Sequence, residues 1–134
     1  LMFATTANPD KPSELITMSM ARAKFCELVA PLITGKGDTS MAFLTGLLSM
    51  IDALLDESLE SVLAKLPLAK EVTEPLLTGK GTMAAIIKQL ELIEHAEWDK
   101  AVIVMEKLEL DKEKTVECYN QALAWADEQA SQMT

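Results

Sequence analysis

Histidine suits both metal binding and acid–base catalysis near neutral pH, and this 134-residue chain has one, His95. Asp99 follows four residues later, so a helix would place an imidazole and a carboxylate on one face. A metal centre needs three or four ligands with supporting hydrogen bonds, and a serine triad would depend on His95 alone. We therefore predict that His95 caps a helix or lies on the surface, with no metal-binding or catalytic residues in the chain.

The two cysteines, Cys26 and Cys118, are too few for a disulfide framework or a thiolate metal site. Neither has a histidine nearby in the sequence to activate it. Both fall within helical patterns, where a reduced cysteine behaves as a small hydrophobic residue. The pattern indicates buried structural thiols and a cytoplasmic setting.

A short Thr-Gly-Lys-Gly segment occurs twice, at residues 34–37 and 78–81. A phosphate-binding loop needs glycine, four residues and then Gly-Lys-Ser/Thr between a strand and a helix, and neither segment fits that order. The simpler prediction is that Gly35 and Gly79 each end a helix, with the next helix starting near Asp38 or Thr82.

The chain is acidic, with 21 acidic and 12 basic residues and a formal charge of −9. This charge argues against nucleic acid and against an anionic membrane as partners. Most of the excess lies in the C-terminal half, either on solvated helix faces or as a docking surface for a partner protein. No acid–base pair stands out among the carboxylates, and no cofactor is predicted.

The elements that must position these residues are helices. Hydrophobic residues make up 49% of the chain and aromatic residues 4%, and strand-like alternation is nearly absent. The pattern predicts an all-α fold, a compact bundle of about seven helices in a single domain over residues 1–134. The expected helices span residues 12–32, 39–55, 59–66, 69–77, 82–96, 98–108 and 112–132.

Three helices carry more specific expectations. The helix at 12–32 is apolar on nearly every side, so it should lie centrally, with Pro31 bending or ending it. Ser58 should cap the helix at 59–66. The helix at 39–55 should present one continuous apolar stripe: Leu44, Leu47, Leu48, Ile51, Leu54 and Leu55.

The last helix should likewise place one set of side chains on a shared face: Val116, Tyr119, Leu123, Ala126 and Ala130. The eight methionines could form a promiscuous binding groove, but core filling is favoured because most fall on apolar faces: Met18, Met20, Met50, Met83 and Met105.

The first residues, Leu-Met-Phe-Ala at 1–4, are expected to be the last turn of a helix stopped by Asn8 and Pro9. The chain is therefore expected to be a C-terminal fragment. No apolar run approaches the ~20 residues that span a bilayer, so no membrane segment is predicted.

Four blocks, together with the order in which they occur, carry a resemblance to a known family. They are RAKFCEL at 22–28, FLTGLLSMIDALL at 43–55, LPL at 66–68 with Val72 following, and AEWD at 96–99. Over residues 13–108 the chain resembles the C-terminal half of the HDOD domain, the HD-related output domain of bacterial signalling proteins. The similar version is the one fused behind an EAL-type cyclic di-GMP phosphodiesterase domain.

The resemblance implies an HD-superfamily-like bundle that lacks the family's metal-binding His-Asp residues. It also implies a regulatory output module rather than an enzyme. Its protein partners would include signalling domains such as an EAL domain in the same chain. An apolar face normally covered by the missing N-terminal helices could also support a homodimer.

Two residues within these blocks have physical consequences. Gly46, inside an apolar helix, should allow two helices to approach closely. Arg22 lies in an apolar helix, where it either extends to the domain edge or is buried with a partner. Three acidic residues are candidates for that partner: Glu27, Asp52 and Asp56.

The preferred hypothesis is a non-catalytic module that relays a cyclic-dinucleotide or other sensory input through protein–protein contacts. A helical adaptor unrelated to cyclic dinucleotides is the main alternative. A degenerate HD-type phosphohydrolase is the third.

Overall fold

A computed structural model describes residues 11–35 and 39–132, and over these ranges the chain is helical without strands. The predicted all-α class is therefore confirmed, with eight helices in the described residues where about seven were expected. The helices are α1 (Lys11–Thr34), α2 (Ser40–Leu48), α3 (Ile51–Leu55), α4 (Leu59–Ala64), α5 (Lys70–Thr78), α6 (Thr82–Glu94), α7 (Trp98–Lys107) and α8 (Lys112–Gln132). The expected helical turn at residues 1–4 and the helix start at Asp38 lie outside the described residues.

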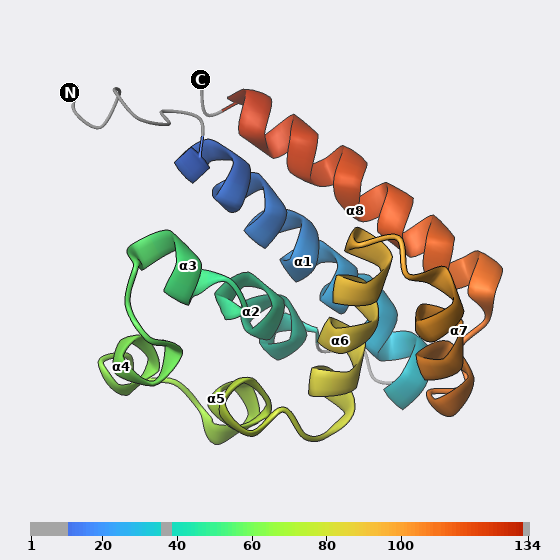
Figure 1. Ribbon diagram of the computed structural model, residues 1–134, viewed down its shortest axis with the longest axis horizontal. Coiled ribbons are helices and arrows are strands. Elements are labelled where there is room, and N and C mark those ends of the chain that lie inside the picture. The colour runs from blue at the N-terminus through green and yellow to red at the C-terminus, as the bar shows by residue number, and fades with distance from the viewer. Residues whose placement is uncertain (1–10, 36–38, 133–134) are drawn as a thin grey trace.

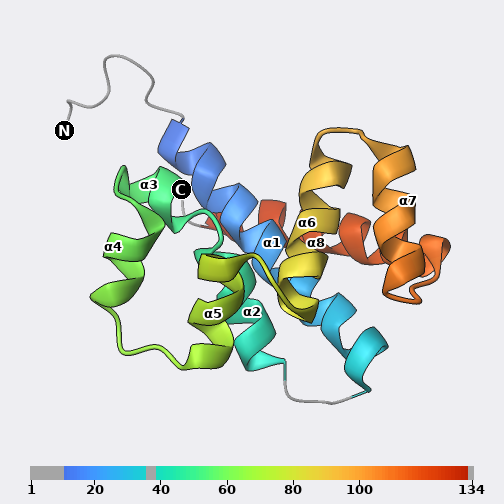
Figure 2. The same cartoon turned by 60° about the horizontal axis from the view of Figure 1, so that its bottom comes forward.

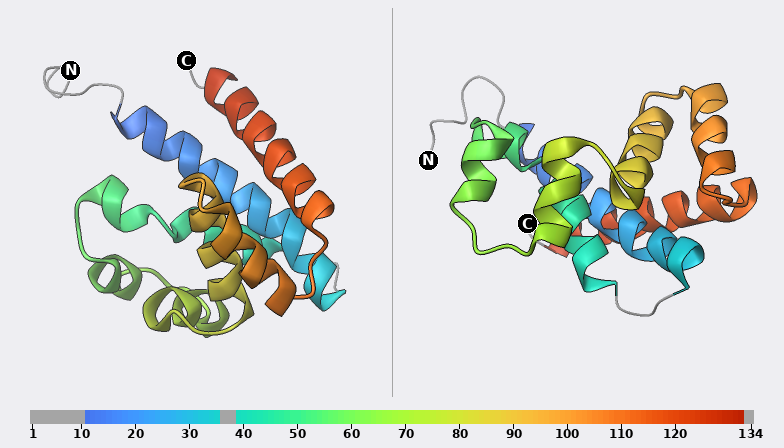
Figure 3. Two further views of the ribbon diagram at one scale, coloured as in Figure 1. Left: turned by 45° about the vertical axis from the view of Figure 1, so that its right-hand side comes forward. Right: turned by 90° about the horizontal axis from the view of Figure 1, so that it is seen from below.

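The long helix α1 runs through the middle of the molecule and α8 packs along it in the opposite direction (Figure 1). The α6–α7 hairpin and the α3–α4–α5 segment lie on either side of α1, as Figure 2 shows. Both views in Figure 3 agree with this arrangement. The central position predicted for the first helix is confirmed, because α1 packs against α2, α6 and α8.

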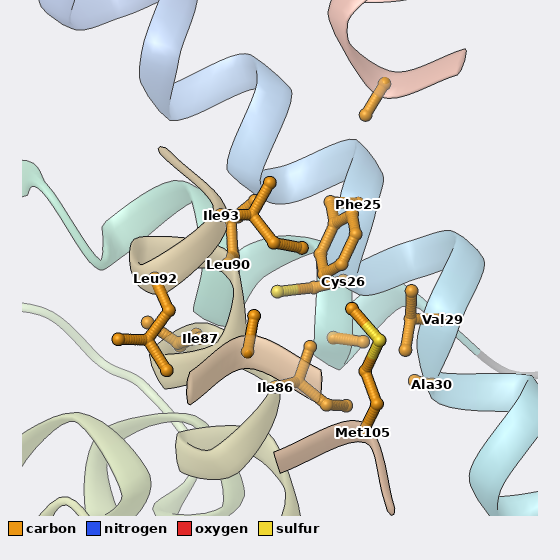
Figure 4. Packing of buried hydrophobic residues seen from close by; sticks show 13 residues of the cluster. Phe25, Cys26, Val29, Ala30, Ile86, Ile87, Leu90, Leu92, Ile93 and Met105 are labelled. Carbon is orange, nitrogen blue, oxygen red and sulfur yellow. The ribbon is translucent and has the colours of Figure 1, made fainter. Parts of the chain in front are cut away.

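The main core lies where α1, α6 and α7 meet. Figure 4 shows Phe25 and Val29 of α1, Ile86 and Leu90 of α6, and Met105 of α7 pointing into the same space. Each of these side chains is almost completely buried. Burying a large apolar side chain stabilises the fold by roughly 1.5–3 kcal/mol, so this cluster is a main stabilising feature of the fold.

A second, smaller core joins α2, α4 and α5 through Leu48, Leu63 and Val72. The short helix α3 has no buried residue. The α3–α5 segment thus depends on few buried contacts, and its local stability should be lower than that of α1 or α6.

The prediction of one continuous helix over 39–55 is wrong. The chain breaks at Ser49 and Met50, between α2 and α3. The Ser49 hydroxyl donates to the Gly46 carbonyl at 2.7 Å, and the Ser49 amide donates to the same oxygen at 3.2 Å. These bonds occupy a carbonyl that helix continuation would use, so the expected stripe is interrupted and Leu55 is exposed.

Most other helix ends lie close to where the sequence predicts them. Gly35 and Gly79 have φ of +70° and +69°, and each amide closes the last helical turn, onto Pro31 and Pro75 respectively. The Ser58 hydroxyl accepts the Ser61 amide at the start of α4, as predicted. Pro31 does not end the first helix, which continues for one turn to Thr34.

Among the described residues, no helix is long and apolar enough to cross a membrane.

Candidate functional site

Arg22 is the buried charge around which three helices meet. It is 6% exposed, and its guanidinium forms a bidentate pair with Glu94 at the end of α6. Its Nε donates to Glu94 Oε2 at 3.2 Å and its Nη2 to Oε1 at 2.8 Å. The Glu91 carboxylate lies further away, at 3.7 Å from Nη1. Two planar groups paired in this way form strong, directional bonds.

The Arg22 Nη1 also donates to the Ser49 hydroxyl at 3.2 Å, at the point where α2 ends. One side chain of α1 therefore bonds to α6 and to the end of α2. The prediction that a buried Arg22 would need a partner is confirmed, but the three candidate partners were wrong. Glu27 pairs instead with Lys24 at 2.6 Å.

Glu94 was missed because it lies 72 residues from Arg22 in the sequence. A signal for it existed. Ile86 and Leu90 are buried on α6, and Glu94 continues their four-residue spacing, which places a carboxylate on an apolar stripe.

Gly46 brings α2 against α1 next to this pair. A Cβ at this position would lie 2.5 Å from the Arg22 carbonyl oxygen and 2.9 Å from the Ala23 Cα. The close approach predicted for Gly46 is confirmed. It positions the end of α2 so that Ser49 can accept from Arg22.

A groove of about 620 Å³ lies beside the ion pair, between the first half of α1 and the middle of α8. Its lining consists of two helix faces closed by one residue of α6: Ser13, Glu14, Thr17, Met18, Ala21, Tyr119, Leu123, Ala126, Asp127 and Glu94. Both helices can be followed in Figure 1, where the start of α1 and the end of α8 lie at the same end of the molecule.

The groove tests two predictions made from the sequence. Met18 was expected in the core but is 38% exposed on the groove wall, whereas Met105 is buried as expected. Leu123 shares a face with Tyr119 and Ala126, as predicted, because all three line the groove, but its side chain is 38% exposed. The buried residues of α8 are Thr115, Ala122 and Ala126, and of these Ala126 belongs to the predicted face.

Tyr119 forms part of the groove and reaches the core. Its ring meets Phe25 edge-on, with the ring centres 6.3 Å apart. Burial raises the pKa of the Tyr119 hydroxyl, and the negative charge of Glu94 raises it further. The phenol is therefore neutral near pH 7 and can donate a hydrogen bond at the groove.

The histidine and the two cysteines lie where they serve the fold. His95 caps the end of α6, and its Nδ1 lies 2.8 Å from the Glu91 carbonyl oxygen, to which an Nδ1–H donates. Cys26 is buried and Cys118 is half-buried, and both are free thiols. Within the described ranges, no three His, Cys, Asp or Glu side chains are grouped so as to hold a metal ion.

Gln89 is a buried polar residue that was not predicted from the sequence. It is fully buried on α6, and neither its amide nitrogen nor its amide oxygen has a hydrogen-bond partner among the described residues. A buried amide group without a hydrogen-bond partner lowers the free energy of unfolding by about 1–3 kcal/mol.

Comparison with known proteins gives two relatives. The chain is 38% identical over 98 residues to the cyclic di-GMP phosphodiesterase CdgJ of Vibrio cholerae serotype O1, covering 73% of this chain and 23% of CdgJ. It is 37% identical over 112 residues to the uncharacterized protein YuxH of Bacillus subtilis strain 168, covering 84% of this chain and 27% of YuxH. The chain thus spans about a quarter of the length of the curated relatives it matches.

No family model matches the chain. No solved structure matches it either.

Proposed function

We propose that this chain is a non-catalytic regulatory module of a cyclic di-GMP signalling protein and that it acts through contacts with other protein segments. The observation that carries the proposal is the 38% identity over 98 residues with the phosphodiesterase CdgJ. Because the match extends through 73% of this chain, it involves most of the helical fold rather than one short motif.

The finer assignment proposed here is to the C-terminal half of an HDOD domain, with an HD-superfamily-like arrangement of helices. The all-helical fold is consistent with this assignment. Two of the resembling blocks also meet in space, since Gly46 of the block at 43–55 contacts the backbone of Arg22 in the block at 22–28.

The regulatory part of the proposal is supported by what the buried charges do. Arg22 and Glu94 pair with each other and hold helices together, which is a structural use of charge rather than a reactive one. The groove beside them has a mostly apolar floor, as surfaces for protein contacts do.

The test has two parts. The purified 134-residue chain, incubated with cyclic di-GMP and Mg²⁺ or Mn²⁺, should release no hydrolysis product, while CdgJ under the same conditions does. CdgJ lacking the matching 98-residue region should still hydrolyse cyclic di-GMP, but at an altered rate. Hydrolysis by the chain alone, or an unchanged rate after the deletion, would contradict the proposal.

A further inference from the structure

We infer that the groove between α1 and α8 docks a helix with apolar side chains on one face and basic side chains flanking that face. This inference rests on the proposed function, because it names the surface and the class of partner through which a non-catalytic module would act. The apolar floor of the groove, the charge of its rim and its length all fit such a helix.

The floor of the groove is apolar. Ala21 and Ala126 lie at its base, and Met18 and Leu123 stand at its walls, each 38% exposed. A methionine wall is adaptable because its side chain is unbranched and polarisable. Covering these side chains with an apolar surface would stabilise a complex by removing them from water.

The rim of the groove is acidic. Glu14 on α1 and Asp127 on α8 both line it, and neither makes an ion pair with another described residue. The third carboxylate, Glu94, is already bonded to Arg22. The lining contains no lysine or arginine side chain, so two unpaired carboxylates remain on opposite helices.

The acidic rim favours some ligands of the groove over others. A phosphate ester, a nucleotide or an anionic membrane would bring negative charge to carboxylates that have no basic neighbour in the lining. A second copy placed groove to groove would oppose the same acidic rims in a chain of formal charge −9. A basic segment is the occupant whose charge complements the rim.

The length of the groove fits a helix. The lining residues of α1 run from Ser13 to Ala21, which is about 12 Å along a helix axis at ~1.5 Å per residue. The wall residues of the two antiparallel helices therefore present a trough two turns long. A third helix in this trough would form a three-helix arrangement. Its apolar residues at i, i+3 or i+4, and i+7 would contact the floor of the groove.

The experiment uses the whole 134-residue chain labelled with ¹⁵N and an 18-residue helical peptide of leucine and lysine, with leucine on one face. The expected result is a saturable set of amide shift changes centred on Ala21, Leu123 and Ala126. The same peptide with glutamate in place of lysine should not bind.

Two groove variants have matched controls. Glu14→Lys should weaken peptide binding roughly fivefold, whereas Glu113→Lys, in the first turn of α8, should change it little. Asp127→Lys should act like Glu14→Lys, and its control is Glu128→Lys on the next, non-lining residue. Circular dichroism shows whether each variant folds. If one groove variant fails to fold, the other groove variant and its control still test the inference.

Several results would overturn the inference: equal weakening by the control variants, shift changes spread over all acidic helix faces, or equal binding of the glutamate peptide. A concentration-dependent dimer that Asp127→Lys disrupts would overturn it in favour of a second copy. These outcomes are separate from the hydrolysis test, because a change of rate after deletion from CdgJ would keep the proposed function even if this groove binds no peptide.

Discussion

At the scale of single residues, Arg22 has the environment that a buried charge requires. Its guanidinium has a bidentate carboxylate partner in Glu94 and a hydroxyl acceptor in Ser49. An isolated charge in this position would carry a desolvation penalty of several kcal/mol. The pair therefore makes each member dependent on the other, and the packing of α6 on α1 dependent on both.

Arg22→Met should lower the free energy of unfolding by about 3–5 kcal/mol, because it leaves the Glu94 carboxylate buried without its partner. The double variant Arg22→Met with Glu94→Leu should recover much of that loss, since both charges are removed together. Urea unfolding followed by tryptophan fluorescence measures the stability of the wild type, of Arg22→Met, of Glu94→Leu and of the double variant. Additive losses in the double variant would show that the two side chains do not act as a pair.

Cys26 gives a prediction about pH. Burial raises the pKa of its thiol from 9.0 to about 12, and the nearby Arg22 charge lowers it by less. The folded state thus holds this proton more tightly than the unfolded chain does. The resulting stability is fully present below pH 9 and is lost as the pH rises from about 9 toward 12.

The wild type should lose about 2 kcal/mol more stability than Cys26→Ala between pH 8 and pH 10.5, because each pKa unit corresponds to ~1.4 kcal/mol. Urea unfolding at the two pH values measures the change in stability of each protein. The effect of the smaller alanine side chain is the same at both pH values, so it cancels when the two changes are compared. Parallel losses in the two proteins would mean that the Cys26 thiol titrates alike in both states.

The residue scale also shows how far the sequence could lead. That Arg22 needs a partner follows from its apolar surroundings in the sequence. The identity of that partner does not, because it depends on which face of α6 packs against α1. Met18 could not be assigned to the surface for a similar reason: α1 is apolar on nearly every side and has no polar face to fix its orientation.

At the scale of helices, the crossing of α1 and α2 depends on the absence of a side chain at Gly46. The α2 backbone lies so near α1 that a Cβ would overlap the Arg22 carbonyl oxygen. Backbone atoms cannot move aside as a flexible side chain can. The two helices would have to separate, and the Ser49 contact with Arg22 would weaken with them.

Gly46→Ala should therefore destabilise the chain by about 2–3 kcal/mol despite the better helix propensity of alanine. Gly79→Ala is the matched control: its Cβ would meet nothing within 4 Å, and only its φ of +69° opposes the change. It should cost about 1 kcal/mol. Thermal unfolding of both variants would contradict this account if Gly79→Ala were the more damaging.

Helix boundaries that depend on local sequence could be predicted and those that depend on other helices could not. Residues 112–132 form the expected last helix, and Gly79 ends α5 through its own backbone conformation. The break between α2 and α3 is different. Ser49 is suited to helix continuation or termination, and here it accepts from Arg22 of a helix far earlier in the chain.

At the scale of the whole molecule, the helices form a bundle in which Arg22 and Glu94 join α1 to α6. Beside this pair lies a groove whose lining includes Glu14 and Asp127. The relatives match this chain at 37–38% identity, and the matched region makes up 23–27% of their length. Within our proposal, a module of this kind alters a neighbouring activity by docking.

The measurement that tests this central claim most directly is the rate of cyclic di-GMP hydrolysis by CdgJ in which the matching region is replaced by this chain. Intact CdgJ and CdgJ lacking the region are measured beside it. We predict that the chimera hydrolyses at a rate close to that of intact CdgJ and different from that of the deletion. A chimera that behaves as the deletion does would contradict the account.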